Sequence, residues 1–167
     1  MSALLYFAYG SNMSLARLQA RVPAARHAGC ARPPAHTPKF HKLGDDGSAK
    51  LDAVPSDAQG DAVLGVLYRM SAQDKAVLDP IEGRGYEVVE VAVESMSDGP
   101  VKAFMYRALR IDPDARPFAW YVNHVLVGAR AAGLPDAYVA AIAATPSIDD
   151  PDPARDARER AIHPGSA

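Results

Sequence analysis

Short apolar runs separated by turn residues predict a mixture of strands and helices along this chain. The first run, residues 4–9, is apolar and aromatic, which predicts a buried strand that ends at the loop Gly10-Ser11-Asn12. Ser14 is a suitable N-cap for the next segment, whose leucine and valine residues share one helical face until Pro23 ends the helix. The chain is therefore expected to begin with a strand that turns directly into a helix.

Two hairpins and one central strand are predicted in the middle of the chain. Turn residues mark the hairpins at Gly44-Asp45-Asp46-Gly47 and at Ser97-Asp98-Gly99. The strands that these turns join are residues 39–43 with 49–54, and residues 86–94 with 101–107. Between the hairpins, residues 62–70 are rich in valine, leucine and tyrosine, which is typical of a central strand.

A capping box predicts a helix between the central strand and the second hairpin. Ser71 is followed three residues later by Asp74, and the residue before Pro80 disfavours helical geometry, so we expect Pro80 to end this helix. Glu82 is then expected just beyond the helix. Gly83 follows it and leaves the backbone free to bend.

The last third of the chain predicts two helices and a polar tail. Apolar residues recur at helical spacing over residues 117–132, Gly133 ends that helix, and a second helix is expected over residues 135–144. Residues 149–167 are rich in Asp, Arg and Pro, so we expect a solvated or frayed tail after one domain over residues 1–148. The order of elements favours the α+β class, with a mainly antiparallel, barrel-like sheet decorated by helices.

Composition narrows the classes of function. The formal net charge of -2 and the pI of about 6.2 give no net attraction to nucleic acid or anionic membranes. A single cysteine, Cys30, excludes an internal disulfide and fits a reducing compartment. Since no apolar run is long enough for a membrane span and the start lacks signal-peptide features, we expect a cytoplasmic protein without nucleic-acid or membrane partners.

Two segments are candidates for chemistry, and each has an ordinary structural alternative. The strand-Gly-Ser-Asn-helix corner at residues 10–12 exposes backbone N–H groups that suit an anion, but such a corner is often only a turn. Glu82 is either a catalytic carboxylate or a solvated turn residue. The tyrosines Tyr86, Tyr106 and Tyr121 either line a pocket or pack in the core. No nucleotide, zinc or nucleophile-elbow motif occurs, and the five histidines lack metal-ligand spacing, so we expect no metal and no cofactor.

The sequence Leu-Tyr-Phe-Ala-Tyr-Gly-Ser-Asn-Met at residues 5–13 and the sequence Leu-Asp-Pro-Ile-Glu-Gly at residues 78–83 together resemble the γ-glutamylcyclotransferase family. Shorter matches at residues 65–68, 128–129 and 133–135 extend the resemblance over residues 4–145. The family fold is an antiparallel barrel decorated by helices. Residues 38–60 depart from the animal enzymes, and the Gly-Ser-Ala-Lys at residues 47–50 is more similar to bacterial relatives.

The resemblance implies an enzyme that needs no cofactor and cyclises a γ-glutamyl group, releasing 5-oxoproline and an amine. Glu82 would be the general base that takes a proton from the substrate's α-amine and returns it to the leaving amine. The residues that would bind the γ-glutamyl group are Tyr6, Phe7, Ala8, Tyr9, Gly10, Ser11, Asn12 and Tyr121.

Several alternatives stay open at this level. Two alternatives on the same scaffold are a non-catalytic domain that binds a small metabolite and an amidohydrolase with Ser11 as nucleophile. The leaving group is an amino acid, a polyamine-type amine, the cysteinylglycine of glutathione or a carrier-bound precursor, and Asn12 after Tyr-Gly-Ser weighs against the glutathione-specific branch. A homodimer is also compatible with the sequence.

Overall fold

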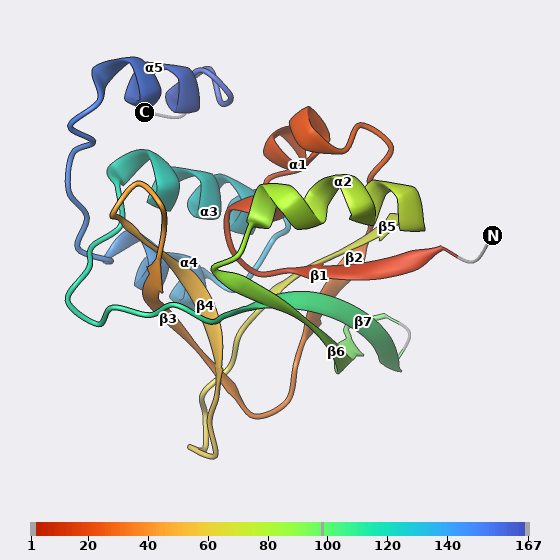
Figure 1. Ribbon diagram of the computed structural model, residues 1–167. Helices are drawn as coiled ribbons and strands as arrows, with labels where there is room; N and C mark the ends of the chain where they lie inside the picture. The colour runs from red at the N-terminus through yellow and green to blue at the C-terminus, as the bar shows by residue number, and fades with distance from the viewer. Residues whose placement is uncertain (1–2, 98, 166–167) are drawn as a thin grey trace.

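Five strands close into a barrel in the computed structural model, which describes residues 3–97 and 99–165 (Figure 1). Their order around the barrel is β1-β5-β2-β6-β7, and every neighbouring pair is antiparallel except β1 with β7. The barrel strands are β1 (Leu4–Ala8), β2 (Arg26–Arg32), β5 (Gly65–Met70), β6 (Tyr86–Ser95) and β7 (Gly99–Ala108). The predicted α+β class and the barrel-like antiparallel sheet are confirmed.

A separate antiparallel hairpin lies beside the barrel and consists of β3 (His36–Leu43) and β4 (Ala49–Pro55). Both predicted hairpins are present, although Asp98 of the second turn lies outside the described residues. The strand β2 was not predicted, because its sequence contains no large apolar residue and six of its seven positions are half-buried or exposed. Its place follows from pairing with β5 and β6 rather than from its own pattern.

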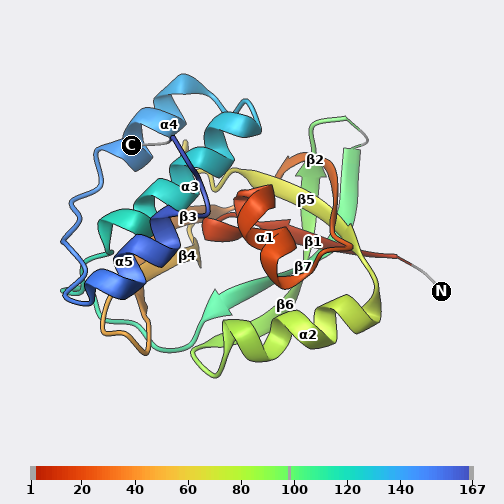
Figure 2. The same cartoon turned by 90° about the horizontal axis from the view of Figure 1, so that it is seen from above.

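Most of the helices lie on one side of the barrel (Figures 1 and 2). The helices are the short 3₁₀ helix η1 (Ser11–Met13), α1 (Leu15–Arg21), α2 (Ala72–Glu82), α3 (Ala119–Ala131), α4 (Asp136–Ala143) and α5 (Pro153–Arg160). In Figure 1, α1, α2, α3 and α5 lie along the upper side of the molecule, whereas α4 lies lower, near the hairpin. None of the described helices is long and apolar enough to span a membrane.

The predicted N-caps Ser14 and Ser71 are confirmed, but the predicted end of α2 is wrong. The Ser71 hydroxyl accepts from the backbone of Asp74, and the Asp74 carboxylate accepts in return from the backbone of Ser71. The helix then continues through Pro80, which sits in the last turn and removes only one hydrogen-bond donor there. Gly83, with a φ of 76°, ends the helix, so Glu82 is its last residue.

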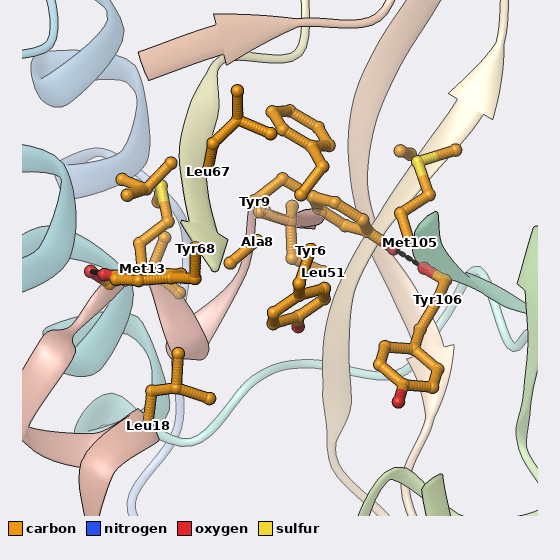
Figure 3. Close-up of a cluster of buried hydrophobic side chains, with 14 of the residues drawn as sticks. Tyr6, Ala8, Tyr9, Met13, Leu18, Leu51, Leu67, Tyr68, Met105 and Tyr106 are labelled. Carbon is orange, nitrogen blue, oxygen red and sulfur yellow. Dashed lines mark hydrogen bonds between the residues drawn. The ribbon is translucent and has the colours of Figure 1, made fainter. Parts of the chain in front are cut away.

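Buried tyrosines and aliphatic residues fill the space between the barrel and the helices. Figure 3 shows part of this cluster, in which the Tyr68 hydroxyl donates to the carbonyl of Met13 (2.7 Å) and the Tyr9 hydroxyl donates to that of Tyr106. Gly128 brings α3 onto η1, since a Cβ there would lie 2.4 Å from the carbonyl carbon of Met13. These contacts fix the position of the turn that follows β1.

The C-terminal segment differs from the expected solvated or frayed tail, because it contains the helix α5. Asp152 caps this helix by accepting from the backbone of Ala154 (3.0 Å). Before it, Asp150 is buried, accepts from the indole of Trp120 (2.7 Å) and pairs with Arg155. Composition alone could not predict this order, since it depends on polar partners in α3.

Candidate functional site

A cavity of about 300 Å³ opens where the turn after β1, the end of α2 and the hairpin β3–β4 meet. Strands β6 and β7 and helix α3 each contribute one tyrosine to its wall, at Tyr86, Tyr106 and Tyr121 respectively. Its size is in the range of small-molecule sites. The two segments that the sequence singled out, the corner at residues 10–12 and Glu82, both line this one cavity.

The amide of Asn12 joins the corner to the end of α2. Asn12 Nδ2 donates to Glu82 Oε1 (2.8 Å) and to the hydroxyl of Tyr6 (3.2 Å), and Asn12 is almost fully buried. Arg21 Nη1 lies 3.3 Å from Glu82 Oε1 and from Asn12 Oδ1. Both contacts of the carboxylate fall on Oε1, and within the described part of the chain no hydrogen bond to Oε2 is found. That oxygen is therefore available to a ligand in the cavity.

Tyr121 approaches the corner from the other side of the cavity. A Cβ on Gly10 would lie 3.1 Å from the Tyr121 hydroxyl, so the glycine provides the room for this close approach. The hydroxyl accepts from the backbone N–H of Leu51 (3.0 Å). Burial raises the pKa of Tyr121 to about 12, which keeps the hydroxyl protonated at neutral pH and able to donate to a ligand.

The structure brings most of the predicted site residues together, but not all of them. The residues that line the cavity are Tyr6, Tyr9, Gly10, Ser11, Asn12, Glu82 and Tyr121. Phe7 and Ala8 are fully buried and do not line it, because Phe7 packs over Gly65 of the neighbouring strand and Ala8 lies in the same core. They support the turn from within the core.

Four cations that the sequence did not single out also line the cavity: Arg17, Arg21, Lys42 and Lys50. Arg17 and Arg21 lie one turn apart on α1, and the two lysines face each other across the hairpin. Helical spacing could have indicated that the arginines share a face, but not that this face meets the end of α2. The carboxylates Asp45, Asp46 and Glu82 line the same cavity, so its wall presents charges of both signs to a ligand.

Metal ligands do not gather in a comparable way. Within residues 3–97 and 99–165, no three His, Cys, Asp or Glu side chains lie as a metal site would require.

Comparison with known proteins identifies the family. A sequence model of the AIG2-like family matches residues 62–142. The γ-glutamylcyclotransferase of Mus musculus is 30% identical over 140 residues, which cover 80% of this chain and 74% of the mouse protein. The chain belongs to the γ-glutamylcyclotransferase, or AIG2-like, family.

Two solved structures share the fold over nearly the whole chain. One, described as a gamma-glutamyl cyclotransferase, is 25% identical with a TM-score of 0.84 and covers 96% of this chain and 98% of its own. An uncharacterized protein of Homo sapiens, loc79017, is 27% identical with a TM-score of 0.85 and covers 97% and 99% of the two chains. The shared fold therefore reaches into the C-terminal segment.

In this γ-glutamylcyclotransferase-family chain, a buried polar network links the cavity to α5. Arg17 Nε donates to the hydroxyl of Ser11 (3.1 Å), and its guanidinium also pairs with Glu159 of α5. His124 of α3 contacts the same carboxylate through Nε2 (2.9 Å). Burial opposes the charge of Glu159, but the hydrogen bond from His124 and the charge of Arg17 hold its pKa at about 2. Helix α5 thus fixes the guanidinium of Arg17, which in turn holds Ser11 of the corner.

Acidification is expected to destabilise the protein from about pH 6.5 downward through His124. Burial lowers the pKa of His124 from 6.5 to about 4. Between these values the unfolded chain binds a proton that the folded chain does not, so the free energy of unfolding falls as the pH falls, by at most about 1.4 kcal/mol per pH unit. Urea unfolding at a series of pH values measures this slope. His124→Gln should have a shallower slope, and an unchanged slope would contradict the assignment.

Proposed function

We propose that this chain is a γ-glutamylcyclotransferase, which converts a γ-glutamyl compound into 5-oxoproline and a free amine. The observation that supports this most strongly is the 2.8 Å contact between Asn12 Nδ2 and Glu82 Oε1. It joins the Tyr-Gly-Ser-Asn corner and the Glu-Gly pair at one cavity, although they are far apart in the sequence. The mouse relative that carries the enzyme's name supports the same reaction.

The reaction needs no nucleophile from the protein. The substrate's own α-amine attacks its γ-carbonyl carbon, a C–N bond forms to close a five-membered lactam, and the bond from that carbon to the leaving nitrogen breaks. Because the α-amine starts as an ammonium and ends as a lactam N–H, two protons pass from it to the leaving nitrogen. Since both reacting groups belong to one molecule, holding them in attack geometry can contribute several kcal/mol.

Glu82 is the proposed carrier of these protons. Its Oε1 is held by Asn12 and Arg21, which fixes the side chain, and its Oε2 is available to the substrate's nitrogen. A carboxylate that takes a proton from the attacking amine can return it to the departing amine in the same cavity. Glu82 would thus serve as general base and then as general acid.

The corner and Tyr121 are the proposed binding groups for the γ-glutamyl portion. Ser11 and Asn12 begin η1, where backbone N–H groups have no partner within the helix, whereas the N–H of Met13 already donates to the carbonyl of Gly10 (3.0 Å). The N–H of Ser11 already faces the Tyr121 hydroxyl. The N–H of Asn12 and the Tyr121 hydroxyl are therefore the proposed donors for the substrate's α-carboxylate or for the oxygen that becomes negative during attack.

An amidohydrolase with Ser11 as nucleophile has less support. The partner of the Ser11 hydroxyl is the guanidinium of Arg17, which cannot accept a proton, and among the described residues no histidine or carboxylate hydrogen-bonds to that hydroxyl. A nucleophilic serine requires such a base.

The experiment that tests the proposal is a panel of γ-glutamyl compounds, assayed by mass spectrometry for 5-oxoproline and for glutamate. We expect 5-oxoproline from at least one compound, and we expect Ser11→Ala to retain that product. Glutamate as the product, lost in Ser11→Ala, would favour the amidohydrolase. Tight binding of a compound without any product would favour a binding domain.

A further inference from the structure

The C-terminal helix α5 docks on the molecule through polar side chains, since none of its residues is buried. Asp150, just before the helix, accepts from the indole of Trp120 (2.7 Å) and from Arg155 through two contacts of 2.6 Å. The helix itself reaches the cavity through Glu159, which pairs with Arg17 of the cavity wall. Asp150 therefore holds this end of the chain in place, whereas Glu159 touches a residue of the candidate site.

The guanidinium of Arg17 needs an anion in its position. Arg17 is 7% exposed, and both its burial and the charge of Arg21, one turn along α1, lower its pKa, whereas Glu159 raises it. His124 Nε2 also contacts Arg17 Nη1 (3.0 Å), but burial lowers the pKa of His124 to about 4, so the ring is neutral at pH 7. Glu159 therefore supplies the negative charge that keeps this buried cation in place.

Arg17 connects Glu159 to the corner after β1. Its Nε donates to the hydroxyl of Ser11 (3.1 Å), and its backbone N–H donates to the Ser14 hydroxyl that caps α1 (3.2 Å). Ser11 begins η1 and is followed by Asn12. A shift of the guanidinium would therefore pull on Ser11 and displace the N–H of Asn12, a proposed donor to the substrate.

The carboxylate of Glu82 has supports that do not involve Arg17. Its Oε1 accepts from Asn12 Nδ2 (2.8 Å) and from Arg21 Nη1 (3.3 Å). The amide of Asn12 is held in turn by the hydroxyl of Tyr6 (3.2 Å). Loss of the anion beside Arg17 should therefore weaken the binding of substrate more than the transfer of protons.

We propose that Glu159 is a positioning residue of the candidate site, which sets the affinity for the γ-glutamyl portion of the substrate by holding Arg17 against Ser11. This inference rests on the proposed function and assigns α5 a part in the site as well as in the fold. Glu159 itself does not touch the substrate in this scheme. It acts through the guanidinium and the serine hydroxyl.

Substitutions of Glu159 are compared by kcat and KM for one γ-glutamyl compound that wild type converts. Glu159→Gln keeps the shape of the side chain but loses its charge. We expect it to raise KM by roughly tenfold while kcat stays within about twofold of wild type. Glu159→Asp keeps the charge on a shorter side chain, so KM should rise less, and it takes the place of Glu159→Gln if that variant does not fold. Asp156→Asn, in the same helix but paired with Arg160, should have wild-type constants.

A double-mutant cycle tests whether the effect passes through Ser11. Ser11→Ala removes the hydroxyl that Arg17 holds, so it should raise KM by a similar factor. When it is combined with Glu159→Gln, KM should be no higher than in either single variant, because both changes break the same series of contacts. If the two factors multiply instead, Glu159 acts by another route and the inference is overturned.

The remaining outcomes distinguish the inference from the proposed function. A Glu159→Gln protein that releases 5-oxoproline with the wild-type KM overturns the inference alone. A loss of kcat or of folded protein without a change in KM also overturns it, since Glu159 would then serve proton transfer or the fold. If wild type releases no 5-oxoproline from any γ-glutamyl compound, the proposed function fails and the inference fails with it.

Discussion

Replacing Glu82 by glutamine is expected to lower kcat for 5-oxoproline release by about 100- to 10,000-fold, the usual contribution of a general acid-base residue. Glutamine has nearly the same shape and keeps an oxygen that Asn12 can donate to, so the contact to the corner survives. It cannot take or return a proton. Steady-state kinetics with a γ-glutamyl substrate measure the loss of kcat. A thermal unfolding curve of the same protein checks that the variant remains folded.

Two control substitutions of carboxylates show whether the loss of activity is specific to the acid group of Glu82. Glu82→Asp keeps the acid chemistry on a shorter side chain and should lose less activity than Glu82→Gln. Glu90→Gln removes an exposed glutamate of β6 that pairs with Lys102 and should have wild-type kinetics. If Glu82→Gln turns over at close to the wild-type rate while remaining folded, Glu82 does not carry the proton.

Gly128→Ala is expected to destabilise the protein by about 1–3 kcal/mol, as overpacking does in other cores. Helix propensity alone would predict the opposite sign, since alanine is favoured over glycine inside a helix by about 1 kcal/mol. Here, however, a Cβ would lie 2.4 Å from the carbonyl carbon of Met13 and 2.5 Å from the backbone nitrogen of Ser14. Backbone atoms cannot rotate away, so η1 or α3 has to shift.

Denaturant unfolding of Gly128→Ala measures this loss of stability. The activity of the same variant should also fall, because η1 begins with the site residues Ser11 and Asn12. Ala131→Gly, at the exposed end of α3, gives the size of the propensity effect in this helix. A Gly128→Ala protein that is more stable than wild type would mean that the helices are not packed as closely as described.

Elements with a local signal could be predicted from the sequence. Ser14 and Ser71 cap their helices as expected, and the turn at residues 44–47 joins its two strands. Each of these depends on neighbouring residues alone. The strand β2 and the helix α5 could not be predicted, because the first takes its place from barrel closure and the second from polar partners elsewhere in the chain.

The candidate site could likewise be predicted only in part. The two sequence motifs predicted that the corner and Glu82 belong to the site, and both line the cavity. Phe7 was predicted to bind substrate because it belongs to the first motif, yet strand alternation turns it into the core. Arg21 and Lys42 carry no motif, and they meet at Glu82's cavity only because a helix and a hairpin from separate parts of the chain converge there.

The most direct test of the central claim is the product formed in water enriched in ¹⁸O. If the α-amine of the substrate attacks its own γ-carbonyl beside Glu82, wild type releases 5-oxoproline that contains no ¹⁸O, in amounts equal to the released amine. If water attacks instead, the product is glutamate with ¹⁸O in its γ-carboxyl group. Labelled glutamate from the wild-type protein would contradict the account.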